Sequence, residues 1–403
     1  MEWKLKDLTV DGKGSYGIGA PAVPYQEDKL TYLRITDIND DGSLNFSDLK
    51  SVDAEDAEKY ILKENDIVFA RTGNSTGRSY FYEKQHGTFV YAGFLIKFSL
   101  DPNKVNPRIM KYYTHSKPYF DWVNSFDTGA TRGNINAKTY GDMEIELPSR
   151  KVQDKIVSIL SSLDWKIELN NKINADLEEM AQAIFKNWFV DFEPFKDGKF
   201  VDSELGMIPE GWKVGTLGEF CKCLLGGTPS RSKEEYWNGD VNWINSGEIN
   251  KFRILEASEK ITELGLAKSA TKLLPKKTTV LAITGATLGQ VSLLEIDTCA
   301  NQSVIGVLEN AEVPYEYIYP FIKDRIEMLI QHQTGGAQQH INKDNVESLI
   351  FLLPAINVLE DYISLVSPMY KRIESQCFEN LYLSLLRDTL LPRLMSGELE
   401  VPE

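Results

Sequence analysis

One nine-residue motif occurs twice in this chain, and a proline follows each copy at the same distance. The first copy is Thr128-Gly-Ala-Thr-Arg-Gly-Asn-Ile-Asn136, before Leu147-Pro148, and the second is Thr334-Gly-Gly-Ala-Gln-Gln-His-Ile-Asn342, before Leu353-Pro354. An apolar run ends at each proline. A chain that carries one unit twice can hold two similar modules at a fixed separation.

Three further pairs of segments repeat in the same order, at offsets of about 209 to 212 residues, compared with 206 for the motif. Chance can produce one such pair, but four in one order indicate an internal duplication. The further pairs are Trp3-Lys-Leu5 with Trp212-Lys-Val214, Tyr32-Leu-Arg-Ile-Thr-Asp-Ile-Asn39 with Trp243-Ile-Asn-Ser-Gly-Glu-Ile-Asn250, and Ile67-Val-Phe-Ala-Arg-Thr-Gly73 with Thr279-Val-Leu-Ala-Ile-Thr-Gly285.

The composition is typical of a globular protein with more than one domain. Apolar residues make up 42% and charged residues 26%, and 403 residues exceed what one hydrophobic core usually supports. No apolar run is long enough to cross a bilayer, and the N-terminus does not resemble a signal peptide. The four cysteines form neither a disulfide framework nor a zinc spacing, so we expect a reduced, cytoplasmic protein without membrane contact.

The net charge argues against a chain that binds nucleic acid alone. It is −15 and is spread evenly along the sequence, whereas a protein that binds DNA by itself is usually basic. DNA binding requires local positive charge or partner subunits that supply the rest.

Each repeat mixes strand-like and helical patterns, which predicts a mixed α/β (α+β) fold. Each carries one expected helix, at 107–124 and 314–331, that begins at a proline. Short β-like runs separated by turns lie at 32–38, 66–71, 80–83, 94–100 and 143–147 in the first repeat, and at 241–245, 280–284, 291–294 and 304–308 in the second.

A long helical pattern follows each repeat. Apolar residues advance by alternating steps of four and three over 152–189, and again over 359–377 before a leucine-rich stretch to 391. Each seam must pack on something, and the obvious partner of each helix is the other. The expected organisation is a module at 1–149, a helix region at 150–190, a linker at 191–211, a second module at 212–355, a second helix region at 356–395 and a tail at 396–403.

Two asparagines fall on the first helical seam. Asn170 and Asn174 are either buried polar residues that set the register of the helix pair, or exposed because the true seam rotates to Leu169 and Ile173. We favour exposure.

A proline predicts a break in each helix region. Pro368 aligns with Ser162 at the repeat offset, and proline is tolerated in a first helical turn but not inside a helix. The longer helices should therefore begin near Pro368 and near Asp164. Residues 164–188 would span about 38 Å, close to one turn of B-DNA, which suggests two modules that read successive faces of one duplex.

Several segments together resemble the specificity subunits of type I restriction–modification systems. Trp188-Phe-Val-Asp-Phe-Glu-Pro-Phe195 followed by Gly206-Met-Ile-Pro-Glu-Gly-Trp-Lys213 resembles their central junction. The two motifs that end in Ile-Asn resemble the ends of their target recognition domains, and Leu391-Pro-Arg-Leu-Met-Ser-Gly-Glu-Leu399 resembles their closing segment. The resemblance covers the whole chain.

This resemblance implies two target recognition domains, each of which reads one half of a bipartite site in double-stranded DNA. The two helices would form an antiparallel coiled coil that sets the gap between the halves. Methyltransferase subunits would dock on the helices and carry S-adenosylmethionine, and a restriction subunit that uses ATP and Mg would join the complex. A fused restriction–methylation enzyme is an alternative partner. The chain itself would bind no cofactor.

Glycine-flanked loops are the first candidate DNA contacts. Arginine can pair with guanine or with phosphate, and the second repeat keeps the threonine and glycines of the first loop but has Ile283 and Gln290 in place of its arginines. Different side chains on one glycine frame are what two modules that read different bases would show, and the alternative is a tight hairpin whose arginines keep it soluble. The candidates are Arg71, Thr72, Asn74, Ser75, Arg78, Thr284, Thr287 and Gln290.

The duplicated motif and one further loop supply the other candidate contacts. Asn and Gln pair with adenine, but they also satisfy turn backbones, and we assign this capping role to Asn136 and Asn342. The loop at 226–232 is either a third recognition loop or a flexible surface loop. The proposed contacts are Thr131, Arg132, Asn134, Gln338, Gln339 and His340 from the motif, and Thr228, Ser230 and Arg231 from the loop.

Two further groups of residues have alternative roles. A cluster of lysines either tracks the DNA backbone or is a solvated face: Lys268, Lys272, Lys276 and Lys277. A group of apolar residues is expected to contact a methyltransferase subunit, with core packing or anchoring of the linker as the alternative: Ile184, Trp188, Phe189, Phe192, Leu386 and Leu390.

The sequence offers no catalytic motif. It has no phosphate-binding loop, no glycine-rich cofactor fingerprint, no amino-methyltransferase motif and no metal spacing among its four histidines, so we predict that the chain is not an enzyme. A two-headed scaffold that binds other proteins is the alternative function, and the acidic charge favours it. Neither DNA half-site follows from the sequence, because loop conformation decides which side chains face which groove.

Overall fold

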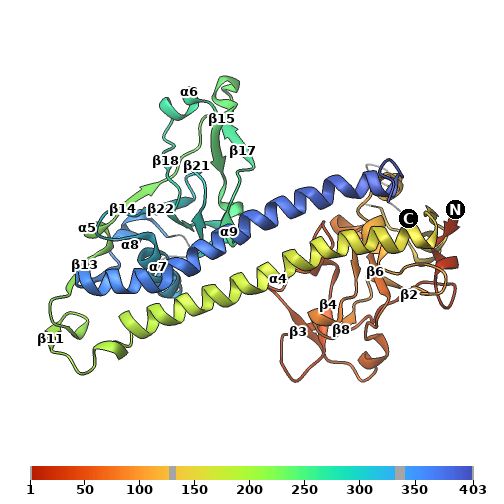
Figure 1. The fold of residues 1–403 in the computed structure, drawn as a ribbon, viewed down its shortest axis with the longest axis horizontal. Coiled ribbons are helices and arrows are strands. Elements are labelled where there is room, and N and C mark those ends of the chain that lie inside the picture. Colours follow the sequence, from red (N-terminus) through yellow and green to blue (C-terminus); the bar gives the residue numbers. More distant parts are fainter. Residues whose placement is uncertain (1, 127–132, 332–340, 402–403) are drawn as a thin grey trace. The chain divides into compact units, whose positions relative to one another are not determined.

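The computed structural model describes residues 2–126, 133–331 and 341–401. Contacts between residues divide the chain into two compact units, unit 1 (Met1–Lys166 with Leu383–Glu403) and unit 2 (Ile167–Tyr382). Each unit contains one predicted module and part of both long helices (Figure 1). Among the described helices, none has a stretch apolar and long enough to cross a membrane.

The described strands of unit 1 form two four-stranded sheets and a separate pair. The first sheet has the order β2 (Ser15–Tyr16), β9 (Leu95–Ser99), β6 (Asp66–Ala70), β7 (Ser79–Phe81). The second has the order β3 (Ala22–Pro24), β5 (Lys50–Val52), β4 (Thr31–Leu33), β8 (Phe89–Tyr91), and β1 (Glu2–Lys4) pairs with β10 (Glu144–Glu146). The short helices are α1 (Ile109–Tyr113), α2 (Lys117–Asn124) and α3 (Ala137–Gly141).

Unit 2 repeats this scheme with additional strands. One sheet has the order β14 (Lys222–Leu225), β22 (Val304–Leu308), β19 (Thr279–Ala282), β20 (Val291–Leu294), β16 (Arg253–Ile254). Another has the order β17 (Glu259–Ile261), β15 (Trp237–Ile244), β21 (Thr298–Ala300), β18 (Leu273–Leu274). Two strand pairs are β13 (Lys213–Thr216) with β23 (Ile350–Leu353), and β11 (Phe200–Ser203) with β12 (Gly206–Pro209) in the predicted linker. The helices are α5 (Leu217–Phe220), α6 (Glu263–Ala267), α7 (Tyr315–Gln331) and α8 (Lys343–Glu347).

The order of the strands shows the duplication directly. The sequence β2-β9-β6-β7 in unit 1 recurs as β14-β22-β19-β20 in unit 2. The parallel pair β4–β8 recurs as β15–β21, with Leu33 opposite Tyr91 in one and Ile244 opposite Ala300 in the other. The predicted mixed α/β class and the two related modules are therefore confirmed.

The helix predicted at 107–124 was wrong as a single element, whereas that at 314–331 corresponds to α7. The first prediction fails because the chain leaves the helix at His115 and Ser116, between α1 and α2. Pro118 lies in the first turn of α2. Proline is tolerated there, but inside one continuous helix it would remove a backbone hydrogen bond and clash with the carbonyl four residues earlier.

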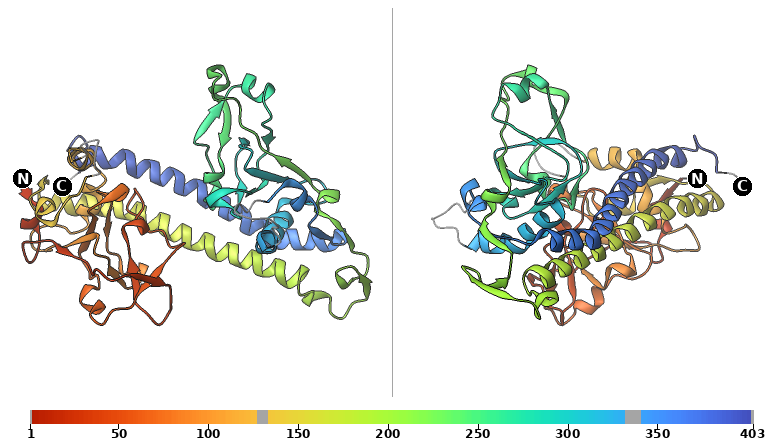
Figure 2. Two further views of the ribbon diagram at one scale, coloured as in Figure 1. Left: turned by 180° about the vertical axis from the view of Figure 1, so that it is seen from behind. Right: turned by 60° about the vertical axis from the view of Figure 1, so that its left-hand side comes forward.

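The two long helices are continuous, so the predicted break near Asp164 and Pro368 was wrong. Helix α4 (Arg150–Phe189) and helix α9 (Ile356–Met395) contain 40 residues each, or about 60 Å, and both run unbroken in all views (Figure 2). Pro368 has no amide hydrogen to donate to the carbonyl four residues earlier. It lies on the exposed side of α9, where water can bond that carbonyl, while Val366 and Tyr370 beside it are buried. Burial of those neighbours outweighs the local cost of the proline.

The helices pack antiparallel through the predicted seam, and the favoured exposure of its asparagines was wrong. Asn170 and Asn174 are both buried. Asn170 donates to Glu379 at 2.8 Å and accepts from the Gln376 amide at 3.0 Å, and Asn174 contacts Cys377 at 3.5 Å. These contacts lie within unit 2, and they satisfy polar groups that would otherwise be costly to bury.

Candidate nucleic-acid interface

The glycine-flanked loops of the two modules share one backbone conformation. Gly73 and Gly77 have φ of 72° and 89°, and Gly285 and Gly289 have φ of 72° and 84°. The amide of Gly77 donates to the Ala70 carbonyl, as that of Gly289 does to Ala282, at 3.0 and 2.9 Å. A side chain on Gly77 or Gly289 would meet a residue of the helix behind the loop at 2.5 or 2.4 Å. Positive φ and close packing both require glycine there, so the frame is structural.

The side chains on the first loop differ in what they contact. Arg78 donates from Nε to Asp40 at 2.7 Å and from Nη1 to the Ile38 carbonyl at 3.0 Å. Ser75, a predicted contact, is buried and is not available to DNA. Thr72 is partly exposed and Asn74 is exposed.

Arg71 is placed differently from Arg78. Its guanidinium lies over the ring of Tyr16, 5.1 Å from the centroid, and within the described residues it makes no ion pair. Its Nε is buried and has no hydrogen-bond partner among the residues that the structure describes. Tyr16 is exposed and was not identified from the sequence.

The second loop presents neutral groups. Thr284 and Thr287 are partly exposed and Gln290 is exposed. Ile283, which stands in place of Arg71, is buried in the core of unit 2. The two loops therefore have one frame and different surface chemistry.

The loop at 226–232 packs on its own module. Thr228 donates to the exposed side chain of Gln302 at 2.6 Å, and Ser230 pairs with Ser232. Arg231 is exposed, but it forms an ion pair with Glu259 and lies 3.6 Å over the ring of Trp237. These contacts hold the loop against its sheet, and Glu259 offsets the charge of Arg231.

The duplicated motif falls partly outside the described residues. Asn136 accepts from the amide of Thr139 at 2.9 Å, and Asn342 accepts from that of Asn345 at 2.8 Å, so the predicted capping role of both is confirmed. Asn134 is exposed. The other candidates from this motif lie outside the described residues: Thr131, Arg132, Gln338, Gln339 and His340.

The predicted lysine cluster divides into two groups. Lys268 and Lys272 are exposed. Lys276 pairs with Glu374, and Lys277 pairs with Glu295 and with Glu374 at 2.9 Å. The second pair of lysines therefore attaches the second module to α9 and contributes little positive charge for a DNA backbone.

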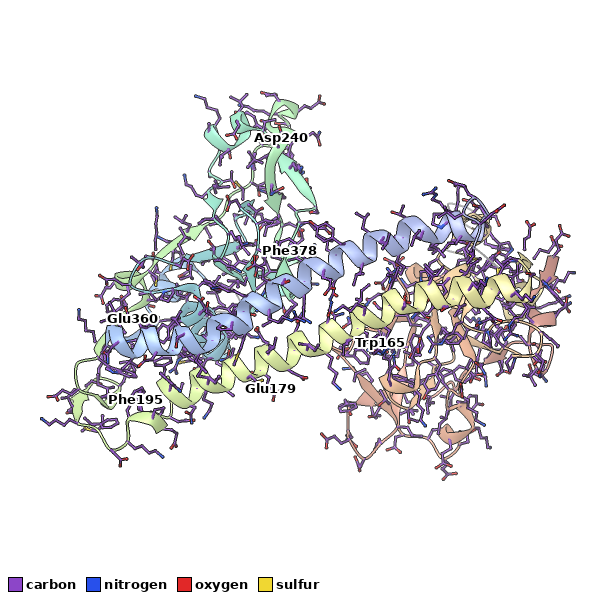
Figure 3. All side chains as sticks on the ribbon, in the orientation of Figure 1. Trp165, Glu179, Phe195, Asp240, Glu360 and Phe378 are labelled. Atoms are coloured by element: carbon purple, nitrogen blue, oxygen red, sulfur yellow. The ribbon has the colours of Figure 1, made fainter. Side chains whose placement is uncertain are left out.

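The aromatic residues at the end of α4 form a core rather than a docking surface. Phe189 is buried against Tyr317 and Tyr362, with ring centroids 4.8 Å apart in both pairs. Trp188 packs edge to face against Phe195, which lies in the following segment and is labelled in Figure 3. Phe192 lies against Trp212, and Ile184 packs on the same core. Leu386 is exposed, and Leu390 packs on the core of unit 1.

A buried charge network that the sequence did not reveal joins the second module to α4. Arg253, with a side chain 1% exposed, donates to Glu178 of α4 at 2.6 Å and to the Tyr319 hydroxyl at 3.1 Å. Lys323 adds a second ion pair to Glu178 at 2.9 Å. Burial alone would raise the pKa of the Glu178 carboxyl, but the two cations outweigh burial and hold that pKa below its usual range.

Unit 1 has a corresponding network around Asp164 of α4. The carboxylate pairs with Lys111 and with Arg387 of α9, both at 3.0 Å, and accepts from Tyr112 at 3.0 Å. Burial opposes ionisation here too, but Lys111 and Arg387 keep the pKa of Asp164 below its usual value. In both units charged side chains attach a module to the helix pair.

Two related modules on an antiparallel helix pair, each with a glycine-framed loop that carries different side chains, define a two-headed recognition protein. The model of the type I restriction modification DNA specificity domain matches residues 16–179 and again residues 209–376. The chain belongs to this family and is the DNA specificity subunit of a type I restriction–modification system. Such subunits are not themselves catalytic.

Individual relatives agree with the family. The chain is 29% identical over 297 residues to the type I restriction enzyme MjaIX specificity subunit of Methanocaldococcus jannaschii, and this match covers 72% of this chain and 69% of the relative. It is 24% identical over 405 residues to the HindI specificity subunit of Haemophilus influenzae, which covers 85% and 88%. The crystal structure of the type I S subunit from M. genitalium has the same fold, with a TM-score of 0.58 at 15% identity over 100% of this chain and 96% of that one.

Proposed function

We propose that each module reads one half of a bipartite site in double-stranded DNA, and that α4 and α9 set the distance between the halves. The observation that carries this proposal is the pair of loops at 71–78 and 283–290, which keep one backbone frame while their exposed side chains change. A conserved frame with exchanged side chains suits two readers of different base pairs.

Methyltransferase subunits would dock on the chain, carry S-adenosylmethionine and add positive charge around the DNA. A restriction subunit that uses ATP and Mg would complete the assembly in the cytoplasm. The net charge of −15 and the pairing of Arg78 and Arg231 with carboxylates leave this chain little attraction for DNA by itself. The proposal therefore places much of the affinity in the partners and the base recognition in this chain.

The experiment is to map methylated bases in cells that express the cognate methyltransferase with and without this chain. Modification at a split motif that depends on the chain is the expected result. Unchanged methylation despite confirmed assembly would contradict the proposal.

The role of the helices has its own test. Seven residues inserted into both helices, after Lys166 in α4 and after Tyr382 in α9, add about 10 Å to each helix. The gap in the methylated motif should grow by about three base pairs, while both half-sites stay the same. An unchanged gap in a variant that still methylates would show that the helices do not set the distance.

A further inference from the structure

Two exposed aromatic residues of unit 1 neighbour Arg71 of the first glycine-flanked loop, one through its ring and one through its backbone. Tyr16 of β2 is 43% exposed and Phe94, in the turn between β8 and β9, is 57% exposed. The amide of Arg71 donates to the Phe94 carbonyl at 3.1 Å, and the Arg71 guanidinium lies over the Tyr16 ring. A cation and exposed aromatic side chains therefore lie close together at this loop.

Among the described residues, the arginine beside these rings has no counter-charge. Arg78, Arg231 and Arg253 each pair with a carboxylate, whereas in the part of the chain that the structure describes Arg71 pairs with none. The ring of Tyr16 fixes its guanidinium from one side, and Tyr16 is itself held because its hydroxyl accepts the Ala137 amide at 3.1 Å. A rigid cation without a partner is suited to an acceptor from outside the chain.

The duplication identifies the matching positions in unit 2. Tyr16 stands opposite Ile96 in its sheet as Leu225 stands opposite Ile305. The amide of Ile283 donates to the Ser303 carbonyl, as that of Arg71 does to Phe94. Tyr16, Arg71 and Phe94 in unit 1 thus correspond to Leu225, Ile283 and Ser303 in unit 2. The backbone contacts are the same, so the two modules differ here in the side chains that a ligand would meet.

We propose that Arg71, positioned by Tyr16, recognises a guanine in the half-site of the first module, and that the second module has no equivalent guanine contact. Arginine pairs with the O6 and N7 atoms of guanine through two donors, and the ring of Tyr16 holds the guanidinium in one orientation for such a pair. Ile283 has no donor and is buried. The inference rests on the proposed function, because it assigns one base contact within it.

The test uses the chain assembled with its methyltransferase subunits and DNA in which 7-deazaguanine replaces each guanine of the first half-site in turn. This base lacks the N7 acceptor but leaves the phosphates unchanged. One replacement should weaken binding by the wild-type complex about tenfold. The same replacement should make no difference to Arg71→Ile, which carries the residue of unit 2, because the contact is already absent.

Further variants separate positioning from folding. Tyr16→Phe keeps the ring and should retain the sensitivity to 7-deazaguanine, whereas Tyr16→Leu should lose most of it. Arg78→Ala is the matched control in the same loop, and its sensitivity should equal that of the wild type. Recognition of the second half-site should be unchanged in every variant, which shows that the complex is assembled and folded.

Three results would overturn the inference. The first is equal sensitivity to 7-deazaguanine in wild type and Arg71→Ile, and the second is a first half-site without a fixed guanine. The third is that Arg71→Ile loses affinity uniformly on all DNA and its binding depends less on salt. The last result would identify Arg71 as a phosphate contact. A failure of the proposed function itself would look different, because the wild-type complex would then modify no split motif.

Discussion

Removal of the Glu178 carboxylate would leave the guanidinium of Arg253 buried without its nearest anionic partner. Breaking a buried ion pair on one side costs about 3–5 kcal/mol. Arg253 keeps the Tyr319 hydroxyl at 3.1 Å and Glu295 at 4.0 Å, and Lys323 is exposed enough to regain water. We therefore expect Glu178→Ala to lower the free energy of unfolding by about 3 kcal/mol, which is roughly a hundredfold change in the unfolding equilibrium.

Urea denaturation of the full chain, followed by tryptophan fluorescence and circular dichroism, measures this loss. Glu179→Ala is the matched control, because its side chain is exposed on the same helix (Figure 3), and it should change stability by less than about 0.5 kcal/mol. The double variant Glu178→Leu with Arg253→Met removes both charges and should recover most of the loss. A cost below about 1 kcal/mol for Glu178→Ala, or a double variant no more stable than the single one, would refute the reasoning.

Three further outcomes follow from other contacts. Gly77→Ala should lower the free energy of unfolding by about 2 kcal/mol in denaturation experiments, because both its φ of 89° and a contact at 2.5 Å with Val123 oppose a side chain. Gly73 has a φ of 72° but open space around it, so Gly73→Ala should cost only about 1 kcal/mol. Equal costs for the two variants would contradict this reasoning. Asn170→Ala should cost about 1–3 kcal/mol, because it removes the acceptor of the buried Gln376 amide on α9. An unchanged urea midpoint would show that water replaces this acceptor. The pKa of Asp164 lies below its usual 3.8 in the folded chain, so the native state binds fewer protons than the unfolded state. This contribution to stability is complete above about pH 5 and is lost as the pH falls through the folded pKa. Asp164→Asn should therefore flatten the dependence of the urea midpoint on pH in that range, and an unaltered acid limb would exclude this role.

The duplication and the helical seams could be predicted because both are patterns along the sequence. The continuity of α9 through Pro368 could not, since it depends on which side of the helix faces water. The burial of Asn170 was equally hidden, because a polar residue on a seam is favourable only where the opposite helix supplies partners such as Gln376. Sequence patterns describe one segment at a time, whereas packing between distant segments decides the continuity of α9 and the burial of Asn170.

The candidate site shows the same division. The glycine frame was predictable, because Gly73 and Gly77 recur in both repeats and have the positive φ that favours glycine. Which arginine lacks a counter-charge was not predictable, since the partner of Arg78 is Asp40, far away in the sequence. Tyr16 carries no motif of its own, and what distinguishes it is the Arg71 guanidinium over its ring, which only the folded chain shows.

The composition of unit 1 has a consequence for the order in which the chain acquires its structure on the ribosome. Its hydrophobic core contains Leu391 and Leu394 together with residues from the first 160 positions, whereas unit 2 is one continuous segment. At a synthesis rate of about 5–20 residues per second, the N-terminal module emerges roughly ten to fifty seconds before the C-terminal end of α9 that completes its core. The middle of the chain can finish folding first. A nascent chain that stops before Leu383 would leave the earliest-made module with exposed apolar surface, available to chaperones and proteases.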